Sequence, residues 1–151
     1  MRDIINKWFD TVSEDTTMIG LLGITTTDDR VYLHDTPDPA SLSTTQRAFI
    51  TYGRVTTSER DYGGVNYGGT TTTFQRGDLI LQVDIWGKDH GVLDQVSERL
   101  DELFEGEKLT CTNHVVQRVS RIDEIDDYDP EWEVNHIITR WRFGPVLRIN
   151  P

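Results

Sequence analysis

The N-terminal part of the chain is patterned as two short helices. Apolar residues recur at intervals of three and four between residues 2 and 12, which predicts a helix with one buried face. They are Ile4, Ile5, Trp8, Phe9 and Val12. A second helix is expected to follow Ser13 as its N-cap and to end at Gly23. Its inward-facing residues are expected to be Met18, Leu21 and Leu22.

Three strands are expected to follow. Residues 31–34 predict a short strand, which the two prolines of residues 35–39 bring to an end. Residues 48–57 are rich in β-branched and aromatic side chains and predict a second strand. Residues 78–86 alternate most regularly between apolar and polar positions. The face of this third strand that we expect in the core carries Leu79, Leu81, Val83 and Ile85.

A longer helix and a pair of strands complete the pattern. Asp89 is expected to cap a helix that runs to Glu105 and ends at Gly106. Its inward-facing residues are expected to be Val92, Val96, Leu100, Leu103 and Phe104. Residues 109–122 and 131–143 predict two strands of a hairpin, with the acidic residues 123–130 as the turn between them.

This order of elements predicts one α+β domain over residues 1–151. Only one helix lies between strands, so the regular strand–helix alternation of a parallel sheet is absent. We therefore expect a mostly antiparallel sheet packed by the longer amphipathic helix and the N-terminal short helices. A length of 151 residues is that of a single domain of ordinary size.

Residues 58–77 interrupt the pattern. They contain five glycines and four consecutive threonines, without a sustained apolar period. Such a segment predicts a long flexible loop or a flexible β-arm. Its bulky residues are Tyr62, Tyr67 and Phe74, and aromatic side chains often carry much of the energy of protein interfaces. We expect these three residues to contact a neighbouring subunit or another protein partner; the alternative is a plain disordered insertion.

Composition adds a strong acidic bias. The chain has 26 Asp and Glu against 15 Lys and Arg, a net charge of −11, which argues against a groove that binds duplex DNA. The bases include only 3 Lys, and the chain holds 17 Asp and 19 Thr. This composition is typical of proteins that work in concentrated salt, so we expect a halophilic source; an acidic mesophilic protein is the alternative. No apolar run is long enough for a membrane span or a secretory signal.

Residues with catalytic or metal-binding chemistry are few. The chain contains no nucleotide-binding, nucleophile-elbow or zinc-protease motif. Cys111 and His114, with His136 on the facing strand, form one candidate nucleophile pair, but their odd spacing places Cys111 and His114 on opposite faces of a strand. We therefore assign no catalytic residue and no cofactor.

Metal sites are weakly supported as well. His34, Asp35 and Asp38 lie in a stiff proline-containing turn, and the acidic cluster at 123–129 lacks the glycine and distal glutamate of a calcium-binding loop. We assign no metal ligand. Trp132 and Trp141 are expected in the last strand, as core or subunit-interface residues rather than as a ligand cage.

The order of segments resembles the tail terminator, or tail-to-head joining, proteins of long-tailed viruses. The resemblance covers residues 13–122 and includes RVY at residues 30–32 and AFITYGRVTTSERD at residues 48–61. Its most specific part is the LQVDIW strand at residues 81–86, which leads into a helix that closes with LDELFEG at residues 100–106. The chain departs from the pattern in its longer segment at 58–77.

The resemblance implies a structural virion protein at the head–tail junction. Such a subunit forms a ring, expected to be a hexamer, that ends the tail tube and contacts the tail tube protein and a neck or head-completion protein. DNA would pass through the lumen without specific binding, since acidic walls repel phosphates. The halophilic composition then suggests a virus of a haloarchaeal host. The alternatives are another neck adaptor or baseplate ring subunit, and a small hydrolase that uses Cys111 or a histidine.

The charge balance predicts that stability rises with salt. Repulsion among 26 carboxylates against 15 bases acts over a Debye length that grows from about 3 Å at 1 M salt to about 30 Å at 0.01 M. The melting temperature should therefore increase between low-millimolar and molar NaCl in a thermal denaturation series. A constant melting temperature across that range would contradict the halophilic interpretation.

Overall fold

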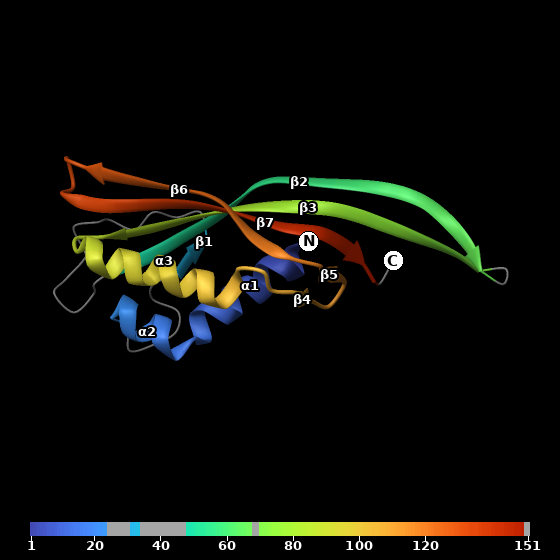
Figure 1. Cartoon of the computed structure of the whole chain (residues 1–151), viewed down its shortest axis with the longest axis horizontal. Helices are drawn as coiled ribbons and strands as arrows, with labels where there is room; N and C mark the ends of the chain where they lie inside the picture. The colour runs from blue at the N-terminus through green and yellow to red at the C-terminus, as the bar shows by residue number, and fades with distance from the viewer. Residues whose placement is uncertain (24–30, 34–47, 68–69, 150–151) are drawn as a thin grey trace.

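The computed structural model describes residues 1–23, 31–33, 48–67 and 70–149. Its elements follow the chain in the order shown in Figure 1. They are α1 (Arg2–Glu14), α2 (Thr16–Leu22), β1 (Val31–Leu33), β2 (Ala48–Tyr67), β3 (Thr70–Gly87), α3 (His90–Phe104), β4 (Leu109–Thr110), β5 (His114–Val116), β6 (Val119–Asp129) and β7 (Val134–Arg148). No helix among the described residues is long and apolar enough to cross a membrane.

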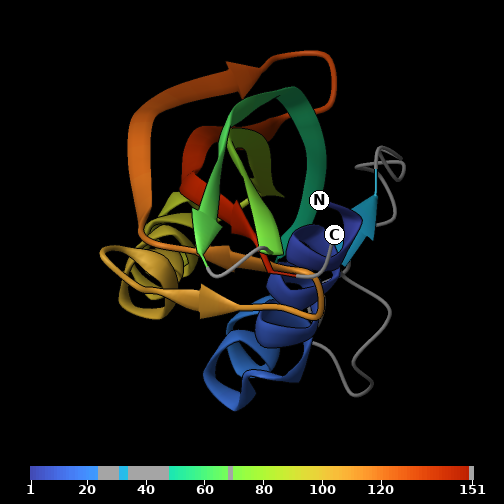
Figure 2. The same ribbon diagram turned by 90° about the vertical axis from the view of Figure 1, so that its right-hand side faces the viewer.

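The strands form one sheet, and the helices lie together on one side of it. The strand order is β1-β2-β3-β7-β5-β4, and β6 also pairs with β7, beside β5 along the same strand. The β1–β2 pair is parallel, whereas every other pair is antiparallel. Seen along its length, the sheet is curled rather than flat (Figure 2). The predicted α+β class with a mostly antiparallel sheet is confirmed.

The junction between α1 and α2 differs from the sequence prediction. Asp15, not Ser13, caps α2, because its carboxylate accepts the Met18 N–H at 2.8 Å. Ser13 remains in the last turn of α1. The same carboxylate forms an ion pair of 2.7 Å with Arg99 of α3, which lowers the pKa of Asp15. The choice of cap is therefore fixed by a partner that is distant in the sequence. Gly23 ends α2 with a positive φ of 71°, as expected.

Helix α3 follows its prediction closely. Asp89 caps it by accepting the Gly91 N–H at 2.9 Å, and the helix ends before Gly106, whose φ is 80°. Most of the predicted inward-facing residues are buried, and Leu103 is half-buried against them. Leu93 is also fully buried, because the apolar face is one position wider than the predicted set.

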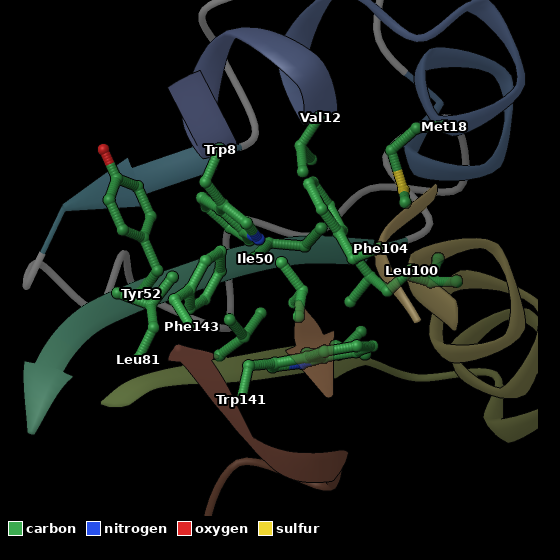
Figure 3. Packing of buried hydrophobic residues seen from close by; sticks show 14 of the residues in the cluster. Trp8, Val12, Met18, Ile50, Tyr52, Leu81, Leu100, Phe104, Trp141 and Phe143 are labelled. Atoms are coloured by element: carbon green, nitrogen blue, oxygen red, sulfur yellow. The ribbon is translucent and has the colours of Figure 1, made fainter. Parts of the chain in front are cut away.

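The core lies between this helical layer and the sheet (Figure 3). Trp8 of α1 lies 4.8 Å from the Tyr52 ring and 6.1 Å from the Phe104 ring, measured between ring centroids. Phe104 in turn meets Trp141 of β7 edge-to-face at 6.2 Å. The aromatic rings thus connect α1, β2, α3 and β7 across one continuous core.

Trp141 has its polar atom satisfied inside this core. Its indole N–H donates to the Thr139 hydroxyl at 3.0 Å, and that hydroxyl donates to the Val83 carbonyl oxygen at 2.9 Å. Both residues are 0% exposed, so the expectation of a core residue holds for Trp141, and it offers no surface to a partner. Trp132 lies outside β7, in the turn before it, and is 44% exposed.

The acidic segment is a strand rather than a turn. Residues 123–129 belong to β6, which pairs with β7 from Val119↔Phe143 to Asp129↔Val134. The turn is confined to residues 130–133, where the Asp129 carboxylate accepts the N–H groups of Glu131 and Trp132 at 2.9 and 3.3 Å. The predicted hairpin of the last two strands is correct, but its turn is shorter and its strands are displaced. Residues 109–122 are not one strand, because β4 and β5 precede β6 as separate short strands.

We predict that truncating the two tryptophans has very different effects on stability. Trp141→Ala removes a fully buried ring and should lower the free energy of unfolding by about 3 to 5 kcal/mol. Trp132→Ala removes an exposed ring and should change it by less than about 0.5 kcal/mol. Chemical denaturation of both variants at the same salt concentration measures the difference. Equal destabilisation would contradict the assigned positions of the two rings.

Candidate assembly interface

Strands β2 and β3 continue beyond the sheet as a two-stranded arm. Pairing with β1 involves β2 residues 50–52, and β3 pairs with β7 from Arg76 onward. Between these limits the two strands pair with each other out to Tyr67↔Thr70. Figure 1 shows this arm extending well past the body of the subunit. The structure therefore gives the β-arm, not the loop, for residues 58–67 and 70–77.

Irregularities in pairing mark the root and the middle of the arm. At the root, register shifts occur between Arg54 and Thr56 on β2, and between Gly77 and Leu79 where β3 pairs with β7. A further shift lies between Tyr62 and Val65. Bulges of this kind bend a strand and increase its twist, so they set the direction in which the arm leaves the sheet.

The expected aromatic contact residues lie along the arm. Tyr62 and Phe74 are register partners, and Tyr67 lies three pairs further toward the tip, opposite Thr70. The pairing thus places Tyr62 of β2 and Phe74 of β3 at the same position along the arm. Their role in an interface remains an expectation.

A second exposed feature is the outer edge of β6. Among the described strands, β6 pairs with β7 alone. Large apolar side chains lie along it and its turn, each between 44% and 53% exposed. They are Ile122, Ile125, Tyr128 and Trp132. Ile125 and Tyr128 point to opposite faces, because side chains alternate along a strand. Only a partner that covers the edge itself would bury them together.

The inner half of β6 is fixed to α3 by Arg121. Its guanidinium contacts Asp101 at 2.9 Å, Glu124 at 2.6 Å and the Ser97 carbonyl oxygen at 2.9 Å. It also lies over the Trp141 ring, 4.9 Å from the centroid. These contacts position the strand, so that the outer half is presented in a defined orientation.

Along β6, the carboxylates nearer to α3 have cationic or histidine partners, whereas those nearer to the turn have none among the described residues. Arg140 of β7 forms an ion pair with Asp123, which lowers the pKa of that carboxyl. His90 of α3 lies between Asp94 and Asp126, 3.1 and 3.7 Å away. In the described part of the chain, the carboxylates after Asp126 contact no Lys or Arg side chain.

The group of His90, Asp94 and Asp126 has the residue types of a metal site. However, Nδ1 of the imidazole faces Asp94, whereas Nε2 faces Asp126. A cation on one ring nitrogen would therefore leave the other carboxylate on the far side of the ring. We interpret the group as a set of polar contacts that link α3 to β6.

The residues of the enzyme alternative do not come together. The His114 Nδ1–H donates to the Asp3 carboxylate at 2.8 Å, and His136 stacks on Trp86 with 3.5 Å between ring centroids. On β7, His114 pairs with Arg148 while His136 is twelve positions earlier, so the two histidines are separated by roughly 40 Å of strand. His34, Asp35 and Asp38 lie outside the described residues.

Cys111 is not prepared for nucleophilic chemistry. Burial raises the pKa of its thiol to about 11, and the nearby Asp3 carboxylate acts in the same direction. Its contact with His114 is made by the backbone, in which the Cys111 N–H donates to the His114 carbonyl oxygen at 2.8 Å. A thiolate at neutral pH would need a nearby positive charge and greater exposure to solvent, which lower the pKa of a thiol.

The sequence interpretation missed the exposed edge of β6. Its acidic residues suggested a turn, and the apolar residues at 122, 125 and 128 follow neither the strand nor the helix period. One signal was present: an eight-residue connection is long for a hairpin, whose loops usually hold 2 to 5 residues.

Comparisons with known proteins give a likeness of fold. No family model matches the chain, and no curated protein matches it significantly. Among solved structures, it is similar to a chain of the "Virion of native gene transfer agent (GTA) particle" with a TM-score of 0.60 and 10% identity. The alignment covers 89% of this chain and 87% of that chain. At this identity the similarity concerns the fold alone, over nearly the whole length of both chains.

We predict that Cys111 reacts slowly with thiol reagents. With a thiol pKa of about 11, its alkylation by iodoacetamide at pH 8 should be about a hundredfold slower than that of an ordinary cysteine, and should keep rising with pH toward 11. The rate is measured by mass spectrometry across a pH series, with Cys111→Ser as the unreactive control. A plateau near pH 8 would show an activated thiol instead.

Proposed function

We propose that the chain is a structural protein of a virion, and specifically a tail-terminator subunit that forms a ring, most simply of six copies. The observation that carries the proposal is the fold shared over 89% of the chain with a chain of a gene transfer agent virion. The segment order that resembles tail-terminator proteins supports the finer assignment. In this proposal the ring lies at the head–tail junction, between the tail tube protein and a neck or head-completion protein.

The arm supports assembly into an oligomer, independently of the similarity in fold to the virion chain. A two-stranded ribbon is marginally stable in water on its own, because it has little surface to bury. Here both strands run past the sheet, out to Tyr67 and Thr70, and leave backbone groups on both outer edges for a neighbour to pair. An arm of this kind is well suited to complete itself on another subunit or on the tail tube.

The charge is compatible with a channel for DNA. A ring of subunits that each carry −11 would present a lumen that repels phosphates, so the DNA would pass without binding. The same acidic composition, with 3 Lys among its bases, supports a virus of a halophilic, haloarchaeal host as the source. A neck adaptor or baseplate ring subunit is the alternative, and it differs in its partner.

We predict that the purified protein forms closed rings and that the arm is needed for them. Arg60 and Arg76 are register partners, so Asp61–Gln75 can be replaced by Asn-Gly, which makes a two-residue hairpin turn between them. This variant should keep the melting temperature of the monomer and lose ring formation or binding to tail tubes. Negative-stain imaging and native mass spectrometry measure the first, and co-sedimentation with tubes measures the second.

A second variant separates the arm's backbone from its aromatic residues. Replacing Tyr62, Tyr67 and Phe74 together by serine keeps the arm at full length, and should weaken assembly if these side chains are its contacts. Unmodified protein that stays monomeric in high salt, even with tail tube protein present, would overturn the ring. Rings that bind a neck or baseplate component but not the tube would favour the alternative.

A further inference from the structure

Charge is separated along the long axis of the subunit. Residues 122–133, which we call the acidic end, comprise the outer part of β6 and its turn, and contain seven Asp or Glu and no Lys or Arg. Figure 1 shows this end at one extreme of the body, opposite the side from which the arm extends. The three carboxylates nearest α3 have partners in Arg140, Arg121 and His90.

Among the side chains that the structure describes, the remaining carboxylates of the acidic end have no cationic partner. Asp127, Asp129, Glu131 and Glu133 contact no Lys or Arg among the residues whose side chains the structure describes. Asp127 and Asp129 accept only N–H groups of their own turn and strand. Exposed apolar residues accompany them, namely Ile122, Ile125, Tyr128 and Trp132. An acidic surface mixed with large apolar side chains suits a basic protein partner.

The opposite end of the body is rich in cations. Residues 108–118 and 142–148, which we call the basic end, contain four Lys or Arg and no Asp or Glu. Arg142 forms an ion pair with Asp78, and Glu107 precedes Lys108, so the excess of positive charge there is small. Arg2 and Arg148 also line one cavity of about 290 Å³ together with Asp3, whose carboxylate is held by His114. Exposed apolar surface occurs here too, because Ile149 is 48% exposed. Figure 1 places the N-terminus and β5 at this end, near the root of the arm.

We propose that the acidic end of one copy docks on the basic end of the next, an inference that rests on the proposed ring. Contacts between two different surfaces of the same subunit are the kind that close into rings. The pairing of two acidic ends would instead place like charges together, which selects against a symmetric dimer. The occupant is a second copy of this chain, because each copy carries both complementary surfaces.

The position of the arm agrees with this arrangement. It leaves the body on the side of the basic end, so a neighbour docked there by its acidic end would lie beside the arm (Figure 1). The arm and the edge of β6 would then belong to one interface. This gives the unpaired edge of β6 and the apolar residues along it a common partner.

Exchanging charges between the ends tests the docking. An acidic-end variant carries Asp127→Lys and Glu131→Lys, and a basic-end variant carries Lys108→Glu and Arg118→Glu; all four residues are exposed. In each variant alone, the substituted side chains meet side chains of the same sign on the neighbouring copy, so its subunit affinity should fall by at least about tenfold. Mixed in equal amounts, the two variants should form rings again, in strict alternation and therefore with an even number of subunits.

Matched controls keep the test specific. Glu14→Lys with Glu98→Lys changes the net charge of the chain as much as the acidic-end variant does, at exposed helix positions outside both ends, and should assemble normally. Circular dichroism shows whether each variant folds; if a double variant does not, the single substitutions Glu131→Lys and Arg118→Glu replace it. Native mass spectrometry reports the stoichiometry of the mixture.

The outcomes distinguish the two proposals. Rings from the unmodified protein and from each variant alone, or folded variants whose mixture fails to assemble, would overturn the end-to-end docking and leave the ring intact. Unmodified protein that never forms rings would overturn the proposed function and the docking together. Restoration only in the mixture, with a one-to-one composition, is the result that we expect.

Discussion

The pairing of β3 with β7 is the interaction on which the rest of the structure depends. It extends from Arg76↔Leu147 to Gly87↔Asn135 and brings the most regular apolar faces of the two strands together. On the helical side, that shared face supports α1 and α3 through Trp8, Phe104 and Trp141. Along its other edge, β7 also holds β5 and β6. Without this pair, neither the helical layer nor the exposed edge strand would have a platform.

The elements that the sequence predicts well are those that bury one face against this platform. Apolar residues recur with the helix period in α3 and alternate with polar ones over residues 78–86, because each element has one face in the core and one in solvent. Such patterns can be recognised from the sequence alone. The same reasoning correctly gives Gly23 and Asp89 their roles at helix ends. The fold class follows from these elements, since a single crossover helix leaves mostly antiparallel neighbours.

The sequence predicts poorly those elements whose conformation depends on a residue distant in the chain, and those that bury no face in the core. Ser13 and Asp15 are both acceptable helix caps, and the ion pair with Arg99 on another helix favours Asp15. The outer half of β6 has solvent on both faces, so no alternation is required of it and its acidity resembles that of a turn. Its charges also protect an open edge against indiscriminate strand pairing. For residues 58–77 the sequence left both a loop and a β-arm open. The structure shows an arm, because β2 and β3 pair with each other out to Tyr67↔Thr70. This pairing leaves no apolar period in the sequence.

The register shifts at the root of the arm have a consequence for how such a protein can change over time. Because side chains alternate with a period of two, the loss or gain of one residue near Val55 that moves the pairing of β2 with β3 by one position would exchange the two faces of β2 beyond that point. The body, whose core residues on β2 end at Tyr52, would be untouched. A one-residue insertion or deletion can therefore present a different set of side chains to a neighbour without a new fold. The root of the arm is therefore a place where a single insertion or deletion can change the surface offered to a partner.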